Sequence, residues 1–227
     1  MNKFKFSALF LSFAILFASC ASMQSNTAKG GAIGAGSGAA LGAIIGGIAG
    51  KGKGAVIGAA IGTAVGGGTG AIIGKKMDKK AAEAAAIEGA QVEKVQDTNG
   101  LAAVKVTFDS GILFDFNSST LSPASRSSLS QFADILRQDP TIDIAVFGKT
   151  DKVGTYDANM TVSNRRAQSV KSFLQSQGVN DYQFKSVQGV GYTQYDEALL
   201  PAQNRVVDIY MYASEAMINK ANAEAGY

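Results

Sequence analysis

The feature that most constrains this chain is a glycine at every fourth position from residue 30 to residue 74, twelve in an unbroken row. The positions between them hold mainly Ala, Ile, Val and Leu. Lys51 and Lys53 divide the row into two apolar blocks, residues 31–50 and 54–74. Each block has about 20 residues and would measure roughly 30 Å as a helix, close to the hydrocarbon thickness of a bilayer.

Three interpretations of this glycine row compete. Flexible glycine-rich linkers are also rich in Ser and other polar residues, which are almost absent here. A helix in water would be poor, because each Gly costs up to about 1 kcal/mol relative to Ala. In a membrane, by contrast, small residues four apart form a ridge on which two helices pack closely. We therefore interpret residues 30–74 as a glycine-zipper helical hairpin associated with a membrane; the pattern leaves open whether it spans the bilayer, oligomerises or lies on the surface.

The first 19 residues have the pattern of an export signal. Lys3 and Lys5 precede an apolar run, residues 6–17, and small residues then lead into Cys20. An ordinary secretory signal would be cut nearby and would leave Cys20 as a free thiol. In the second interpretation residues 17–20 are a lipobox, and Cys20 becomes the lipid-modified N-terminus of a tether over residues 20–29. We favour the lipobox, because the single cysteine of an exported chain has no partner for an internal disulfide.

Composition excludes several function classes. The chain has no histidine and one cysteine, so it has no Ser-His-Asp or Cys-His pair, no histidine metal site and no internal disulfide. The net charge of +3 falls to near zero when two signal-peptide lysines are removed, and a near-neutral protein gives no reason to expect a nucleic-acid partner. We expect no enzyme activity, no cofactor and no metal.

The connector, residues 75–100, combines lysines with an Ala-rich run and three glutamates. These are strong helix formers with few side chains large enough for a core. We therefore expect an exposed spacer helix that ends near residues 97–100. Its lysines either contact anionic lipid head groups or form a solvated helix face.

Residues 101–213 alternate strand and helix patterns. Ser122 and Pro123 have the residue types of an N-cap and a first helical position, and Gly178 is a helix stop. Such alternation predicts an α/β sandwich, with residues 214–227 as a tail. The expected strands are residues 101–108, 142–146, 182–190 and 205–212, and the expected helices begin near residues 123 and 163.

An acid and an arginine stand out in this region. Asp151 follows a predicted strand, where functional groups often gather, although an isolated Asp there is more often a cap or turn residue. Arg166 is expected in the first turn of a helix, where the helix dipole disfavours a cation and an anionic partner would compensate. An arginine fork binds a carboxylate with two hydrogen bonds. The pair therefore suits a small zwitterion with one ammonium and one carboxylate.

Three motifs occur in order: FDFNSS at 114–119, GKTD at 148–151 and NRVVDI at 204–209. Together they resemble the C-terminal domain of the OmpA family, which binds the diaminopimelate of bacterial peptidoglycan. The resemblance covers residues 101–213 and implies a βαβαββ-type α+β sandwich. It implies that Asp151 binds the ammonium of diaminopimelate and Arg166 the carboxylate at the same centre. It further implies neutral hydrogen bonds from Asn117, Thr150 and Asn159, with Asn204 and Arg205 lining or bracing the pocket.

Two positions depart from the family pattern. Lys149 stands where the family commonly has His, and Val206 stands where it commonly has a second Arg. Neither is an expected ligand of diaminopimelate. We expect the departures to alter the rim of the pocket more than its centre.

The glycine row resembles the glycine-zipper segments of bacterial envelope lipoproteins. In bacterial lipoproteins an Asp after the lipidated cysteine usually directs retention in the inner membrane, and here Ala21 follows Cys20. The resemblances therefore imply a lipid-anchored outer-membrane protein that faces the periplasm and tethers that membrane to the wall. The alternative is an oligomeric assembly or pore component, in which the wall-binding domain only positions the glycine hairpin. An enzyme acting on the wall is the least supported class.

Overall fold

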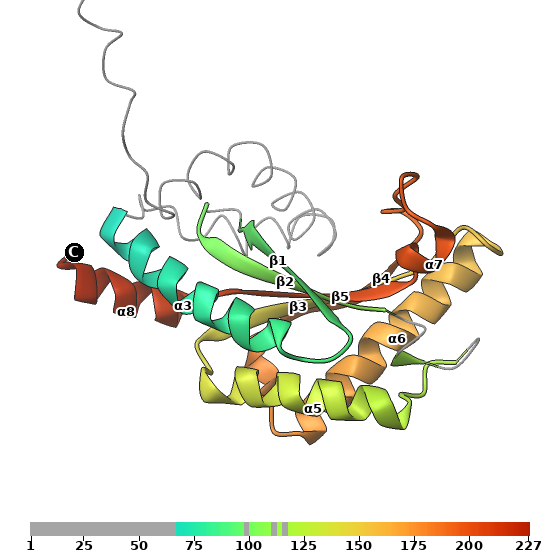
Figure 1. The fold of residues 1–227 in the computed structure, drawn as a ribbon, viewed down its shortest axis with the longest axis horizontal. Coiled ribbons are helices and arrows are strands. Elements are labelled where there is room, and N and C mark those ends of the chain that lie inside the picture. Colours follow the sequence, from blue (N-terminus) through green and yellow to red (C-terminus); the bar gives the residue numbers. More distant parts are fainter. Residues whose placement is uncertain (1–66, 98–99, 110–112, 115–117) are drawn as a thin grey trace, which may run out of the picture. The chain divides into compact units, whose positions relative to one another are not determined.

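A computed structural model of the protein describes residues 67–97, 100–109, 113–114 and 118–227 (Figure 1). The predicted signal peptide, Cys20, most of the glycine row and Asn117 lie outside the described residues.

The centre of the described fold is a mixed five-stranded sheet with the strand order β1-β2-β5-β3-β4. β3 and β4 are parallel, and the other neighbouring strands are antiparallel. The strands are β1 (Ala90–Gln96), β2 (Ala102–Asp109), β3 (Ile142–Lys149), β4 (Phe184–Gly191) and β5 (Val206–Ala213).

The start of α5 and the end of α6 lie where the residue patterns predicted. α5 (Pro123–Gln138) starts after Ser122, whose side chain accepts a hydrogen bond from the Ser125 backbone N–H. α6 (Tyr156–Ser176) is followed by Gly178, which has a positive φ of 90°. The order β2-α5-β3-α6-β4-β5 confirms the predicted α/β class and βαβαββ pattern. The remaining elements are α3 (Gly67–Ala85), the short 3-10 helix η1 (Asp181–Gln183), α7 (Pro201–Asn204) and α8 (Glu215–Ala225).

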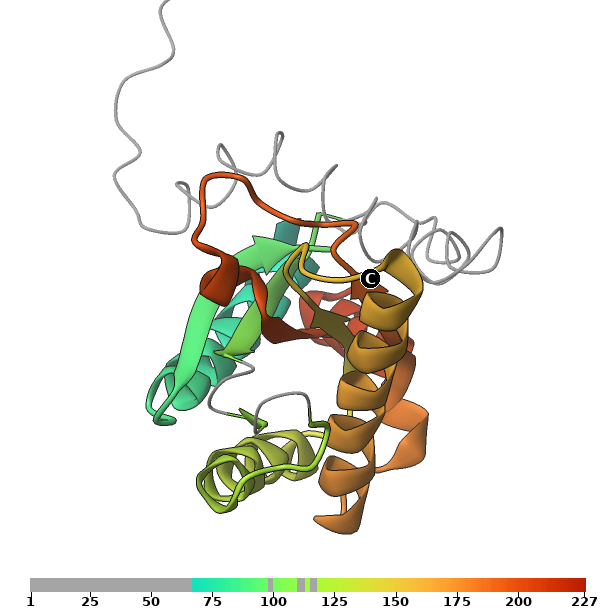
Figure 2. The same cartoon turned by 90° about the vertical axis from the view of Figure 1, so that its right-hand side faces the viewer.

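The main core lies between one face of the sheet and the helices α3, α5 and α6 (Figures 1 and 2). Side chains alternate between the two faces of a strand, so every second residue of the central strands points to these helices. Phe108 of β2 and Phe132 of α5 meet edge to face, with ring centroids 5.8 Å apart. Other fully buried members are Leu129 and Leu136, Ile142, Ile144 and Val146, Val170 and Leu174, and Val207, Ile209 and Met211.

The expectation of an exposed spacer helix over residues 75–100 is wrong. α3 ends at Ala85, and β1 follows as an edge strand paired with β2. α3 is packed against the core through Ile73, Met77, Ala81 and Ala84. These residues recur at helical spacing on one face, and two of them, Ala81 and Ala84, are small. The lysines are not one solvated face either, because Lys80 is buried and donates a hydrogen bond to Glu83 at 2.8 Å.

The last eight residues of the glycine row, 67–74, belong to α3. A Cβ atom at Gly70 or Gly74 would meet nothing within 4 Å, so these two glycines make no close helix contact. α3 packs along α8, which forms where a tail was expected (Figure 1). The hydroxyl of Thr69 donates to Oδ1 of Asn222 at 2.7 Å. Within the described ranges, no helix is both long and apolar enough to cross a membrane.

Candidate functional site

Asp151 lies directly after β3, in a loop that leads into α6. Its side chain is almost fully buried. One carboxylate oxygen accepts a hydrogen bond from the Val153 backbone N–H at 3.0 Å, and the other forms an ion pair with Nη1 of Arg205 at 2.6 Å. Arg205 immediately precedes β5, and the antiparallel pairing of β3 with β5 brings the two residues together.

Arg166 does not lie in the first turn of its helix, as the sequence suggested. α6 begins at Tyr156, where the Thr155 side chain accepts from the Ala158 backbone N–H as an N-cap. Arg166 is therefore in the middle of a 21-residue helix, where the helix dipole has little effect on a side chain. The dipole argument for an anionic partner fails for this residue.

The environment of Arg166 nevertheless leaves its charge without a carboxylate partner among the described residues. Its Nε donates to the backbone carbonyl of Ser118 at 3.1 Å, and its guanidinium lies 5.2 Å from the ring centre of Phe114. Burial lowers the pKa of Arg166, the neighbouring charge of Arg205 lowers it further, and Asp151 acts in the opposite direction. Two arginines thus share the surroundings of one carboxylate.

Two glycines fix the distance between α6 and the sheet. A Cβ atom on Gly148 would lie 2.3 Å from the Ser163 carbonyl oxygen, and one on Gly189 would lie 2.1 Å from the Asn164 backbone nitrogen. Oδ1 of Asn164 also accepts from the Gly189 N–H at 2.6 Å. This close approach places Arg166 beside the end of β3. Sequence reasoning missed Gly189 and Asn164; the signal was a glycine inside a predicted strand, which often marks a close backbone approach.

Two of the expected polar contacts hold loops in place. The Asn159 side chain donates to the Val153 carbonyl at 2.9 Å and to the Thr155 carbonyl at 3.1 Å. The Asn204 side chain accepts from the Asp196 N–H at 2.8 Å and donates to the Asp196 carbonyl at 3.0 Å. These contacts brace the loops on either side of Asp151 and Arg205.

Thr150 directly precedes Asp151 and has an unusual hydroxyl. Its backbone N–H donates to the Gly191 carbonyl at 3.0 Å. Its hydroxyl is buried and has no hydrogen-bond partner among the described residues. Buried polar groups in native proteins nearly always have a partner, so this hydroxyl calls for an explanation.

The two departures from the family pattern lie at the ends of the paired strands β3 and β5. The Lys149 Nζ forms an ion pair with Oδ2 of Asp208 at 2.6 Å. Val206 points to the same side of β5 as Asp208, because side chains alternate along a strand. Both departures therefore belong to the face of the sheet opposite the main core, and their effect on the rim of the pocket stays a prediction.

Partly exposed aromatic side chains lie near the loop after Asp151, and the sequence did not indicate them. Tyr156 and Tyr192 meet edge to face, with centroids 5.8 Å apart, and the Lys152 ammonium lies 4.6 Å from the ring centre of Tyr195. Val153 beside them is 77% exposed. In the described part of the chain, no three acidic, cysteine or histidine side chains gather as a metal site would require.

These features define a class: a mixed sheet with helices on one face and an acid-arginine site at the end of its central strands. Residues 113–223 match the model of the OmpA family, and residues 1–78 match the YMGG-like Gly-zipper model. The C-terminal half of the chain is therefore an OmpA-family domain, and a glycine-zipper segment precedes it. The family that the motifs indicated is confirmed.

Curated relatives match parts of the chain. Outer membrane protein A of Bordetella avium is 44% identical over 78 residues, which cover 34% of this chain and 40% of the relative. Probable lipoprotein YiaD of Escherichia coli (strain K12) is 38% identical over 102 residues, which cover 43% of this chain and 46% of the relative. The chain thus matches less than half the length of these relatives.

The fold also resembles solved structures. A MotB-like protein of Desulfovibrio vulgaris superposes with a TM-score of 0.50 and 19% identity, over 64% of this chain and 91% of that chain. At this identity the likeness concerns the fold alone.

Proposed function

We propose that this protein binds the diaminopimelate of peptidoglycan non-covalently, without catalysing a reaction, and tethers the outer membrane to the cell wall. The observation that carries the proposal is the group formed by Asp151, Arg166 and Arg205. A single buried carboxylate stands beside two arginines, one of which has no carboxylate partner in the described structure. This arrangement is complementary to a ligand that presents an ammonium and a carboxylate together.

Asp151 would bind the ligand ammonium. A carboxylate has about four acceptor positions, and the described contacts of Asp151 use only part of this capacity. The Arg205 side chain is 43% exposed. Because ion pairs that reach solvent contribute only about 0–1 kcal/mol, Arg205 can shift toward solvent or toward the ligand at little cost.

Arg166 would bind the ligand carboxylate. Its Nε is occupied by the Ser118 carbonyl, which fixes the plane of the guanidinium and leaves the terminal N–H groups for two parallel hydrogen bonds to a carboxylate. The buried hydroxyl of Thr150 would gain its missing partner from the same ligand. In this proposal Asn159 and Asn204 position the loops, and Asn117 supplies a further hydrogen bond.

We further propose that Cys20 carries the lipid that holds the protein on the outer membrane, facing the periplasm. Relatives named as an outer membrane protein and as a lipoprotein support this location. Each buried CH₂ of an acyl chain contributes about 0.8 kcal/mol, so several chains give a nearly permanent anchor. The glycine row would add helix–helix contacts in the membrane and a route to homo-oligomers.

Sedimentation with purified sacculi tests the wall-binding proposal. The fragment should begin at Gly67 and not at Leu101, because α3 and β1 contribute to the core. Asp151→Ala and Arg166→Ala should each weaken binding by about 2–5 kcal/mol, since each leaves one ligand charge unpaired. The control variant Asp157→Ala removes an exposed acid from α6, the helix that carries Arg166. It should bind as wild type does.

Two outcomes of the sedimentation experiment are decisive. If the variant that combines Asp151→Ala with Arg166→Ala pellets like wild type, the site assignment is wrong. Lysine-type peptidoglycan should bind weakly to the wild-type fragment, because it lacks the centre that carries both charges.

Labelling with palmitate tests the anchor. The full-length chain should take up label, and Cys20→Ser should not, because only the thiol of Cys20 can receive the lipid. The absence of label in both forms, with unchanged electrophoretic mobility, would show that the segment is an ordinary cleaved signal.

A further inference from the structure

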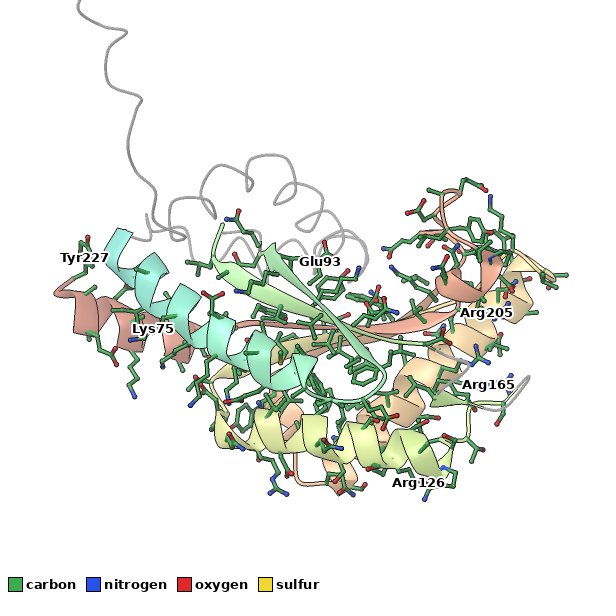
Figure 3. The ribbon with its side chains drawn as sticks, in the orientation of Figure 1. Lys75, Glu93, Arg126, Arg165, Arg205 and Tyr227 are labelled. Atoms are coloured by element: carbon green, nitrogen blue, oxygen red, sulfur yellow. The ribbon has the colours of Figure 1, made fainter. Side chains whose placement is uncertain are left out.

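A groove of about 530 Å³ lies between one face of α6 and the segment that leads into α5. Its α6 wall consists of residues three or four apart, which share one face of a helix. Figure 3 shows two arginines of the groove, Arg126 and Arg165, on the same side of the molecule as Arg205. The polar lining includes Ser119, Thr120, Arg126, Arg165, Ser169 and Ser172.

The groove is positively charged. None of the residues that line it is acidic. Arg126 and Arg165 form no ion pair with any described residue, whereas Arg137, at the other end of α5, pairs with Asp134 at 3.2 Å. Arg126 is one of the first four residues of α5, and the first turn of that helix contains no acid. The positive end of the helix dipole therefore adds to the two arginine charges.

The groove adjoins the Asp151 site through a short piece of backbone. Arg166 holds the carbonyl of Ser118, and the next residue, Ser119, already lines the groove. From Arg166 to Ser172 the helix rises roughly 9 Å. An extended peptide covers that distance in roughly three residues. One short peptide can therefore reach both places.

We propose that the groove binds a second carboxylate of the wall peptide, a few residues along from the diamino acid held by Asp151 and Arg166. This inference rests on the proposed function. Arg126 and Arg165 bind the carboxylate, the hydroxyls of Ser169 and Ser172 complete its hydrogen bonds, and Leu121 and Phe173 give apolar contact to the residue that carries it. The groove thereby selects peptides with a free carboxyl group over peptides in which that group is amidated.

The test compares two soluble stem peptides that contain diaminopimelate, one with a free terminal carboxylate and one with a terminal amide. Binding of each to the full-length protein in detergent is measured by calorimetry at fixed ionic strength. Wild type should bind the free acid about tenfold more tightly, as expected for hydrogen bonds to a charged group. The variant with Arg126→Gln and Arg165→Gln should bind both peptides with equal affinity, close to that of wild type for the amide.

A matched control removes two positive charges elsewhere, with Arg137→Gln on α5 and Lys220→Gln on α8, and should keep the tenfold preference. The proposal is overturned if wild type shows no preference, if the groove variant retains it, or if the control loses it. Asp151→Ala separates this question from the wall-binding proposal. If both peptides bind wild type equally and both lose binding in Asp151→Ala, only the groove proposal is overturned. If neither peptide binds wild type, both proposals are overturned.

Discussion

Two ion pairs connect the end of β3 to β5, and both measure 2.6 Å. Lys149 and Asp208 form a closed pair: Asp208 is 1% exposed, and its other oxygen accepts from the Thr107 hydroxyl at 2.6 Å. Asp151 and Arg205 form an open pair, with the Arg205 side chain 43% exposed and a second arginine nearby. Distance alone therefore does not distinguish a structural pair from a binding site. Solvent access and a surplus charge do.

The largest effect on stability should come from the closed pair. Asp208→Ala leaves the Lys149 ammonium, whose side chain is 17% exposed, without its partner. Breaking a buried pair in this way typically costs about 3–5 kcal/mol, and we expect about 3 kcal/mol in urea unfolding. Folded protein should still bind sacculi. If the folded Asp208→Ala variant no longer binds sacculi, the closed pair also contacts the ligand.

Replacing Asp143 should have a smaller effect on the free energy of unfolding, and it should stabilise the protein where Asp208→Ala destabilises it. Burial raises the pKa of this carboxyl to about 6, against an opposing effect of Lys185 at 3.5 Å. Because the folded state then binds a proton more tightly than the unfolded state, the free energy of unfolding should fall as pH rises from about 4 to about 6. The full shift would correspond to about 3 kcal/mol. Because the side chain of its partner Lys185 is 35% exposed, solvent screening reduces this to about 1 kcal/mol.

Asp143→Asn should therefore be about 1 kcal/mol more stable than wild type at pH 7. It should also lose the pH dependence between about 4 and 6. Urea unfolding at several pH values measures both. An Asn variant that is less stable than wild type at pH 7 would mean that the pair with Lys185 outweighs the cost of burying the carboxylate.

The smallest effect on stability should come from the open pair. Arg205→Gln should change the free energy of unfolding by less than about 1 kcal/mol, because the Arg205 side chain is 43% exposed to solvent. Its wall binding should become less sensitive to salt, since one of the two arginine charges near the ligand is removed. A stability loss as large as that of Asp208→Ala would contradict the division into closed and open pairs.

Much of this domain could be predicted from local patterns. The Ser122 cap, the Gly178 stop and the alternation of strands each depend on a few neighbouring residues, and the structure has them as expected. The place of Asp151 after a strand followed from the same patterns. The contacts of Asn159 and Asn204 with their loops did not, because they depend on how the loops fold back.

Two failures of prediction share a physical cause. The sequence predicts a solvated spacer where α3 lies, because core-facing residues such as Ala81 and Ala84 are small. The sequence predicts the start of α6 seven residues too late, because residues 156–162 carry little apolar periodicity. In each case tertiary packing decided what local propensity left undetermined.

The packing of α3 has a mechanical consequence. The C-terminal end of the glycine row is built into a 19-residue helix that is held along its length by Ile73, Met77 and Ala84. A pull applied at Gly67 would be carried by this helix and by its contacts with α8 and the sheet, with no slack to be taken up first. The helix measures roughly 28 Å. Under load α3 would act as a stiff strut of set length, so in the proposed tether the described part of the chain would add no slack of its own.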